Sequence, residues 1–268
     1  MSTNKKDSHN KLVRDQFIEI IDQFTKQAIP FADLLAQSNE ESTKLLIKMS
    51  QLSMSDTALD VACGPGLLSC SLAPYAQRVT GIDLVPAMIE KAQKSQQEKK
   101  LSNIDWKIGD ILPLPFTDSK FSVVVCRYAF HHFLRPEAVL KEMMRVSKPK
   151  GRVAIIDVFT SSAVQSDAYD QVEKLKDPSH VRTLPLADLQ DMVAKAGLVN
   201  AKAEFYRIEM KFEDNLKASF PRQKGDIDKI RQAVTNDIGQ DKIGMGACRR
   251  GKEVYLNYPI VMIVGEKS

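Results

Sequence analysis

The chain has 268 residues, of which 43% are hydrophobic and 27% are charged, and its formal net charge is +4. This composition is ordinary for a globular protein with a sizeable core, and it excludes disordered and fibrous classes. Because the small positive charge is spread among 34 acidic residues, it argues against nucleic acid as a partner.

Signals for export, membrane insertion and metal binding are missing from the sequence. The polar amino end, MSTNKKDSHNK, is not followed by the apolar segment of a signal peptide, and no apolar run reaches the length of a membrane span, about 18 residues. The four cysteines form no CxxC pair and lack the histidine spacing of a zinc site. We therefore expect a cytoplasmic protein with no membrane span, no disulfide and no metal.

The first part of the chain, residues 1–52, precedes the regular pattern and looks helical, most clearly in LVRDQFIEIIDQFTKQA. No repeat or low-complexity linker divides the rest. We expect residues 1–52 to form an N-terminal helical lid on a single domain, residues 53–268.

From Thr57 onward, strand-like and helix-like segments alternate. The strand-like segments are TALDVA, RVTGID, NIDWKIGD and FSVVVCRY. The first two are each followed by a helix-like segment, LLSCSLAPYA and PAMIEKAQKSQQEKK, and Pro86 lies in the first turn of the second helix. This order predicts an α/β fold with a parallel sheet and helices on both faces.

The carboxyl-terminal half continues this pattern. Apolar residues at helical spacing predict helices over 137–147 and 186–196, and the remaining strands are VAIIDVF, AKAEFYRIEM and VYLNYPIVMIVGE. Pro259 lies inside the last of these, so that strand should be bulged there or paired on one side only.

The last two strands are separated by residues 211–252, which have helical spacing and more basic than acidic residues. We expect this insertion to join the N-terminal helices in covering the crevice at the carboxyl ends of the strands, where open α/β sheets bind ligands. Its basic residues indicate either a solvated surface or a cationic wall beside an anionic acceptor.

A glycine loop, LDVACGPGLL, follows the first strand and opens a helix. Without a Cβ, Gly64 and Gly66 let backbone amides approach a ligand closely. Asp83 ends the second strand, 19 residues after Gly64, where an acid can accept hydrogen bonds from the two hydroxyls of a ribose. Both a dinucleotide and S-adenosylmethionine fit this description.

Asp60, just before the glycines, favours the second cofactor. It would repel a pyrophosphate, and Ser69 stands where a dinucleotide loop has its third glycine. An acid would instead stabilise the ammonium group of a methionine moiety. The alternatives that stay open are an NAD(P)-dependent Rossmann oxidoreductase and a protein that binds S-adenosylmethionine without turning it over.

Four segments resemble, in order and spacing, the motifs of class I SAM-dependent methyltransferases: LDVACGPG, GIDLVPAMIEKA, GDILPLPFTDSKFSVVVCRYAFHHF and VLKEMMRVSKPKGRVAIIDV. They are most similar to the small-molecule branch that includes the ubiquinone and menaquinone biosynthesis C-methyltransferases, the methyltransferase type 11 domain. The resemblance covers about residues 57–158. It implies a Rossmann-like, seven-stranded, mostly parallel sheet with an antiparallel last strand. It also implies S-adenosyl-L-methionine as cofactor, S-adenosylhomocysteine as product and a small-molecule substrate.

The resemblance also implies which residues bind the cofactor. Carried over position by position, these are Asp60, Ala62, Gly64 and Gly66 at the methionine part, Asp83 at the ribose, Leu84 and Met88 at the adenosine, Gly109, Asp110 and Ile111 at the adenine edge, and Arg127 beside the cofactor. Two positions depart from the family pattern. Ala62 replaces a commoner glycine, and we expect it to fit an unstrained turn. Ser122 replaces the usual aspartate of the fourth strand.

Methyl transfer needs little more than an acceptor atom held about 3 to 3.5 Å from the methyl carbon. A general base is required only if the acceptor keeps its proton at neutral pH. His132 and His131 follow the fourth strand and are candidate catalytic residues, the alternative being packed side chains. Asp157, which ends the fifth strand, is the other acid near the site.

Two neighbouring aromatic residues, Tyr128 and Phe130, either pack in the core or cradle the sulfonium. The same stretch, RYAF, does not resemble the NPPY-type segment of amino-group methylators of adenine or glutamine. A small organic acceptor remains, methylated on oxygen, carbon or nitrogen.

Overall fold

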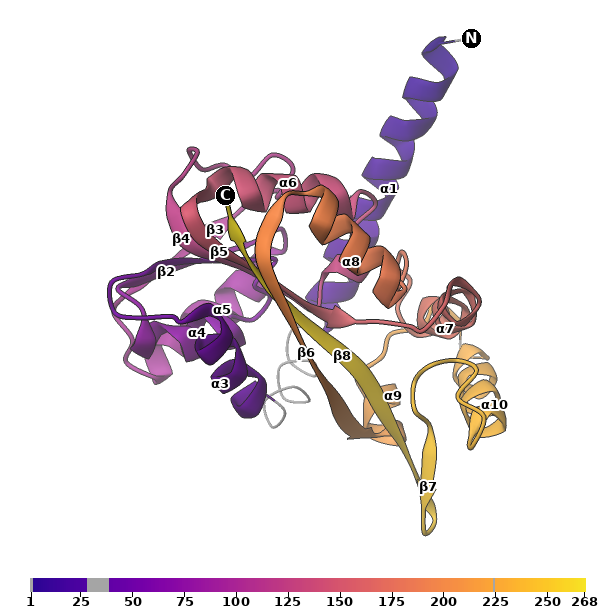
Figure 1. The fold of residues 1–268 in the computed structure, drawn as a ribbon. Helices are drawn as coiled ribbons and strands as arrows, with labels where there is room; N and C mark the ends of the chain where they lie inside the picture. Colours follow the sequence, from indigo (N-terminus) through magenta and orange to yellow (C-terminus); the bar gives the residue numbers. More distant parts are fainter. Residues whose placement is uncertain (1, 28–38, 224) are drawn as a thin grey trace.

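The computed structural model describes residues 2–27, 39–223 and 225–268, with side chains from Lys11 onward. Its centre is a mixed sheet of the order β3-β2-β1-β4-β5-β8-β6, with a short β7 paired to β8 (Figure 1). The strands are β1 (Thr57–Val61), β2 (Arg78–Asp83), β3 (Ile104–Ile108), β4 (Phe121–Arg127), β5 (Ser147–Val158), β6 (Leu198–Lys211), β7 (Cys248–Arg250) and β8 (Glu253–Lys267).

The first five strands are parallel, and β8 runs antiparallel to both β5 and β6. The predicted α/β fold, with its mostly parallel sheet and reversed last strand, is therefore confirmed. The short strand β7 was not predicted; it forms a hairpin with the start of β8, where Arg250 pairs with Glu253.

Pro259 lies inside β8 and is paired on one side only, as predicted. It pairs with Arg207 of β6, whereas the ladder between β8 and β5 begins one residue later, at Ile260. Because proline has no N–H, it cannot donate to a second strand, but its carbonyl still accepts from the amide of Phe159 at 3.2 Å.

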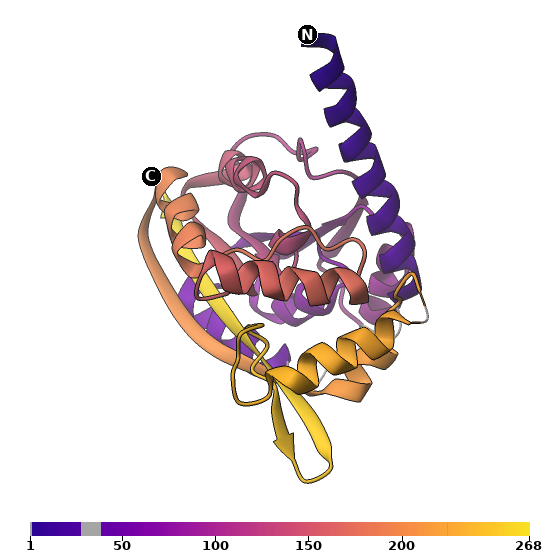
Figure 2. The ribbon, with the colours of Figure 1, turned by 90° about the vertical axis from the view of Figure 1, so that its right-hand side faces the viewer.

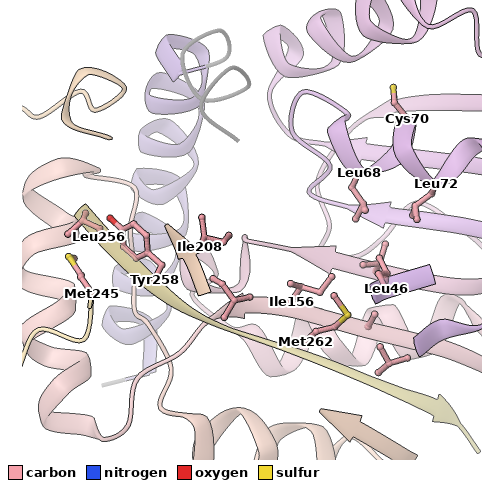
Figure 3. Packing of buried hydrophobic residues seen from close by; sticks show 14 of the residues in the cluster. Leu46, Leu68, Cys70, Leu72, Ile156, Ile208, Met245, Leu256, Tyr258 and Met262 are labelled. Carbon is pink, nitrogen blue, oxygen red and sulfur yellow. The ribbon is translucent and has the colours of Figure 1, made fainter. Parts of the chain in front are cut away.

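Helices cover both faces of the sheet. They are α1 (Ser2–Gln27), α3 (Asn39–Ser50), α4 (Leu67–Leu72), α5 (Pro86–Glu98), α6 (Pro136–Val146), α7 (Ala163–Lys176), α8 (Leu186–Lys195), α9 (Phe212–Lys217) and α10 (Asp226–Asp237), with short 3-10 turns η1 (Ala73–Tyr75) and η2 (Phe130–His132). Buried side chains of α3, α4, α7, α9 and α10 form the core on one face, and those of α6 and α8 form the core on the other. Figure 3 shows part of the first core, with Leu46 of α3 near Met262 of β8.

The described parts of the predicted lid, residues 1–52, form two helices that pack in different places. α3 belongs to the core, where Leu46 is buried. α1 packs through Ile20 and Phe24 against Val85 and Met88 near the start of α5, and its amino-terminal half projects from the body (Figures 1 and 2). The part of the lid over 28–38 lies outside the described residues.

The helices of the described ranges differ from membrane-spanning helices. None of them combines the length and the hydropathy of a membrane-spanning helix. α1 is the longest, and its sequence is strongly polar.

Candidate active site

A cavity of about 210 Å³ opens at the carboxyl ends of β1, β2 and β4, beneath α1. Nine of the eleven residues expected to bind the cofactor line it: Asp60, Ala62, Gly64, Asp83, Leu84, Met88, Asp110, Ile111 and Arg127. The fold thus brings together side chains from four separate motifs of the sequence, as expected for the carboxyl edge of a parallel sheet.

The two glycines of the loop after β1 have different surroundings. Gly64 has a φ of +52° and nothing within 4 Å of the place of a Cβ, so it faces open space at the cavity. Gly66 is not among the described lining residues; at a φ of +74°, its Cβ would lie 2.5 Å from Trp106 and 2.7 Å from Ala92. Gly66 therefore permits close packing of the loop against α5 and β3.

Gly109 is the other predicted residue that the described cavity wall does not include. Its amide donates a hydrogen bond to the carbonyl of Asp83 at 3.0 Å. This bond ties the end of β3 to the end of β2, so Gly109 supports the position of Asp83.

Ala62 adopts a φ of 55°, in the left-handed region. The expectation of an unstrained turn at this position is therefore wrong, because a residue with a Cβ is disfavoured there. Tyr128, directly after β4, has a φ of 56°. Both residues line the cavity, and strained backbone of this kind gathers at functional sites.

Asp83 is buried and holds the glycine loop. Its Oδ2 accepts from the amide of Gly64 at 2.8 Å, and its Oδ1 accepts from the amide of Val85 at 2.9 Å. Burial raises the pKa of Asp83, although these amide hydrogen bonds act in the opposite direction. Because each carboxylate oxygen can accept a second bond, Asp83 can still receive two hydroxyl groups from a ribose.

Asp60 and Arg127 form a polar end of the same cavity. Burial raises the pKa of Asp60 to about 6, against a 2.6 Å hydrogen bond from the Ser69 hydroxyl and the charge of Arg127. Arg127 Nη1 is buried and has no hydrogen-bond partner in the described part of the chain. A free carboxylate would satisfy Arg127 and an ammonium would favour the ionised form of Asp60, so this end fits the amino-acid part of S-adenosylmethionine.

The departure at Ser122 lies away from this cavity. Its hydroxyl donates to the carbonyl of Thr57 at 3.2 Å and accepts from the Thr57 amide at 2.9 Å. These bonds tie β1 to β4 at their amino ends, so an acid at this position would not reach the cavity.

α1 supplies part of the cavity wall that the sequence motifs did not include. Phe17, Ile20 and Phe24 line the cavity from this helix. Gln16 fixes the helix to the body, since its Nε2 donates to the carbonyls of His132 at 3.2 Å and of Ser179 at 2.7 Å. The spacing of the three apolar residues, on one face of a helix, was the available signal.

A second cavity, of about 130 Å³, adjoins the first. Phe24, Tyr128 and His132 line both cavities. The rest of the second wall comes from His131, from α7 and α9 with the segments that follow them, and from the strands β5, β6 and β8. The three shared side chains mark the junction between the two spaces.

His131 lines the second cavity. Its Nδ1 lies 2.7 Å from Asp157 Oδ1, and its amide donates to Asp157 Oδ2 at 3.2 Å. Burial favours the neutral ring, but the charge and hydrogen bond of Asp157, together with the charges of Glu173 and Asp177, raise the pKa of His131. With Nδ1 on the carboxylate, Nε2 is left for a ligand.

His132 has the opposite electrostatic environment. Burial and the neighbouring His131 lower its pKa, so the ring is neutral. Its Nδ1 lies 3.1 Å from the carbonyl of Ser179, which assigns the proton to Nδ1 and leaves Nε2 as an acceptor. Phe24 meets the ring edge-on at 5.0 Å.

The two aromatic candidates differ in position. Tyr128 borders both cavities, and its hydroxyl lies 2.8 Å from that of Tyr206. Phe130 is buried in the core against Phe133, so core packing describes Phe130 and only Tyr128 lies at the site.

Several residues of the second cavity were missed by sequence reasoning. α7 contributes Glu173 and Lys176, whose Nζ lies 2.6 Å from Glu173 Oε1 and 3.3 Å from the hydroxyl of Tyr258. The insertion contributes Asn215, Ala218 and Ser219, which are uncharged.

The basic residues of the insertion face solvent in most cases and pair with acids there, for example Lys217 with Asp214 and Arg231 with Glu213. None of the described ones lines the second cavity. The structure thus favours a solvated surface over a cationic wall.

Residues 59–155 match the family described as "Methyltransferase domain". The chain is 27% identical to the uncharacterized methyltransferase YcgJ of Bacillus subtilis over 91% of this chain and 97% of the relative. The crystal structure of YcgJ has the same fold, with a TM-score of 0.78 and 24% identity over 85% of this chain and 99% of the other.

Two further relatives match over about half of their own length. A demethylmenaquinone methyltransferase of Lactobacillus johnsonii is 34% identical over 42% of this chain and 48% of the relative. A 2-phytyl-1,4-naphtoquinone methyltransferase of Nostoc sp. is 30% identical over 48% of this chain and 58% of the relative. By its matched domain, its relatives and its fold, this chain is similar to the Rossmann-like methyltransferases.

Proposed function

We propose that the chain transfers the methyl group of S-adenosylmethionine to a small organic acceptor, on oxygen, carbon or nitrogen. The observation that carries this proposal is the pair of adjoining cavities. The first has the acids and the arginine that suit the cofactor, and the second shares Phe24, Tyr128 and His132 with it. A methyl group passed between two molecules requires such a junction.

When bound, S-adenosylmethionine supplies a methyl group that its sulfonium has already activated. We assign the ribose hydroxyls to Asp83, the ammonium to Asp60 and the carboxylate to Arg127. Leu84 and Met88 would pack on the adenosine, and Asp110 and Ile111 would border the adenine. Support comes from the lone pairs left on Asp83 and from the unpartnered Nη1 of Arg127.

The chain's own contribution is to orient the acceptor, exclude water and hold a proton. His132 borders both cavities with its Nε2 available as an acceptor, and this supports a position beside the transferred group. His131 can take a proton from the acceptor at Nε2, because Asp157 stabilises the resulting imidazolium. Both histidines are therefore proposed as catalytic residues.

The apolar walls of the second cavity suit a flat organic molecule. Tyr169, Tyr258 and Ile208 lie on them. The Lactobacillus and Nostoc relatives are named for quinone acceptors, and methylation of a quinone ring is one instance of the proposed reaction. We also place the protein in the cytoplasm, since its four cysteines are free thiols.

The first test separates this proposal from an NAD(P)-dependent oxidoreductase. A ligand at about 100 times its dissociation constant stabilises a protein by about 2.7 kcal/mol, so S-adenosylhomocysteine should raise the melting temperature measurably and NADH should not. A shift with NADH alone would overturn the proposal.

The second test separates catalysis from binding alone. Methyl-labelled S-adenosylmethionine is incubated with the protein and a metabolite extract, and label is followed into organic products. Transfer by the wild type and its loss in Asp83→Ala are expected. Cofactor binding without transfer would instead favour a protein that binds S-adenosylmethionine and does not turn it over.

A further inference from the structure

The second cavity contains a buried polar atom that the protein leaves unsatisfied. Asn215 of α9 is 8% exposed and lines this cavity, and its Oδ1 has no hydrogen-bond partner in the described structure. Its Nδ2 is used in a 3.0 Å contact with Met210 Sδ. An unsatisfied buried acceptor destabilises a protein, so its presence beside a cavity points to a ligand that brings a donor.

Strand register places Asn215 at one end of the cavity floor. The floor includes Val158, Ile208, Met210, Tyr258 and Ile260. Along β8, Ile260 pairs with Val158, Tyr258 pairs with Ile208, and Leu256 pairs with Met210. Figure 3 shows Ile208, Tyr258 and Leu256 together on this face of the sheet.

The two ends of this floor have different partners. His131 is bonded to Asp157, the residue before Val158, and therefore lies at the Ile260 end. Asn215 contacts Met210 and therefore lies at the Leu256 end. Ile260 and Leu256 are four steps apart along β8, which corresponds to about 13 Å.

Lys176 lies between these ends, above Tyr258. Two of its three N–H donors are used, by Glu173 and by the Tyr258 hydroxyl, and the third has no partner among the described residues. Glu173 balances the charge of Lys176, and Asp177 is a further acid on the wall of this cavity. A hydroxyl on the ligand can both donate to Asn215 and accept from Lys176.

We propose that the second cavity binds an acceptor carrying a neutral hydroxyl group on the order of 13 Å from the His131 end, and that Asn215 and Lys176 hold this hydroxyl. The inference rests on the proposed function for the role of the second cavity. It adds a recognition element: a molecule of matching length without the distal hydroxyl leaves Asn215 buried and unsatisfied, and it binds more weakly.

The test uses two probes, 4-(4-hydroxybutyl)phenol and 4-butylphenol, which differ only in the distal hydroxyl. Their dissociation constants are measured by calorimetry on the full chain, with and without saturating S-adenosylhomocysteine. The wild type should bind the hydroxylated probe about tenfold more tightly, the usual effect of one hydrogen bond to a buried group. A ratio near one, or no binding of either probe, would overturn the proposal.

The variant Asn215→Leu keeps the branched shape of the side chain and removes the unsatisfied atom. It should lose the tenfold preference and melt at a higher temperature than the wild type. Thr183→Val is the matched control, because Thr183 Oγ1 is also buried without a described partner but lines neither cavity. It should keep the preference.

A preference retained in Asn215→Leu, or a lowered melting temperature, would show that Asn215 serves the fold, and would overturn the inference. The proposed function fails separately, through the absence of S-adenosylhomocysteine binding or of label transfer.

Discussion

The two glycines of the loop after β1 show how one short motif both packs against its neighbours and borders a cavity. Gly66 is closely surrounded by Trp106 and Ala92, whereas Gly64 faces open space. We expect Gly66→Ala to lower the free energy of unfolding by about 2 to 4 kcal/mol, since it adds a clash to left-handed strain. Gly64→Ala adds left-handed strain without a clash, so it should lower the free energy of unfolding by less. Urea denaturation of the two variants measures the difference, and equal losses would contradict it.

Asp60 gives the cofactor site a pH dependence of known sign. Burial holds its pKa at about 6, and only the ionised carboxylate attracts an ammonium. The affinity for S-adenosylhomocysteine should therefore fall as the pH drops through about 6, as measured by calorimetry. Asp60→Asn should bind more weakly at pH 8 and lose this dependence. An unchanged pH profile in the variant would assign the titration to another group.

Substitutions distinguish the proposed roles of the two histidines, because each role affects a different measured quantity. His132→Ala should lower turnover more than cofactor affinity, and unchanged turnover would remove His132 from the mechanism. His131 must be unprotonated to accept a proton, so activity should rise with pH through a pKa above the ordinary value of 6.5. Asp157→Asn removes the charge that raises this pKa and should move the rise to lower pH, in addition to slowing the reaction.

At the scale of elements, α7 carries a buried ion pair between Lys176 and Glu173. Removal of one partner should therefore cost more stability than removal of both. Lys176→Met would leave Glu173 buried without its partner and should cost about 3 to 5 kcal/mol. The double variant Lys176→Met with Glu173→Leu should recover most of this loss. Denaturant unfolding of the single and double variants tests the coupling, and additive losses would contradict it.

Sequence patterning predicted the long strands but not α7, and the reason lies in the buried side of that helix. Besides Tyr169 and Val172, α7 buries the polar residues Ser166, Asp170 and Glu173. An apolar stripe is therefore absent, although the helix is well covered. A helix whose buried side is partly polar loses the signal by which amphipathic helices are recognised, and Glu173 and Lys176 were missed for this reason.

At the scale of the whole molecule, the residues that line the first cavity were predicted far better than those that line the second. Asp60, Gly64 and Asp83 lie within one βαβ unit, where strand order alone brings them together. Asn215 and Lys176 line the second cavity only because β8 runs antiparallel between β5 and β6. No local sequence pattern specifies contacts between residues so far apart in the chain.

The position of Phe24 has a consequence for the rate of the reaction cycle. This residue of α1 borders both cavities, Gln16 of the same helix is bonded to the body, and Gln23 Nε2 donates to the carbonyl of Phe220 in the insertion at 3.2 Å. On the proposed function, we expect the spent cofactor and the methylated product to leave past α1, and we expect the displacement of this helix to limit the steady-state rate. Added sucrose should slow wild-type turnover in proportion to viscosity. It should slow Gln23→Ala less. A wild-type rate independent of viscosity would instead make methyl transfer the slow step.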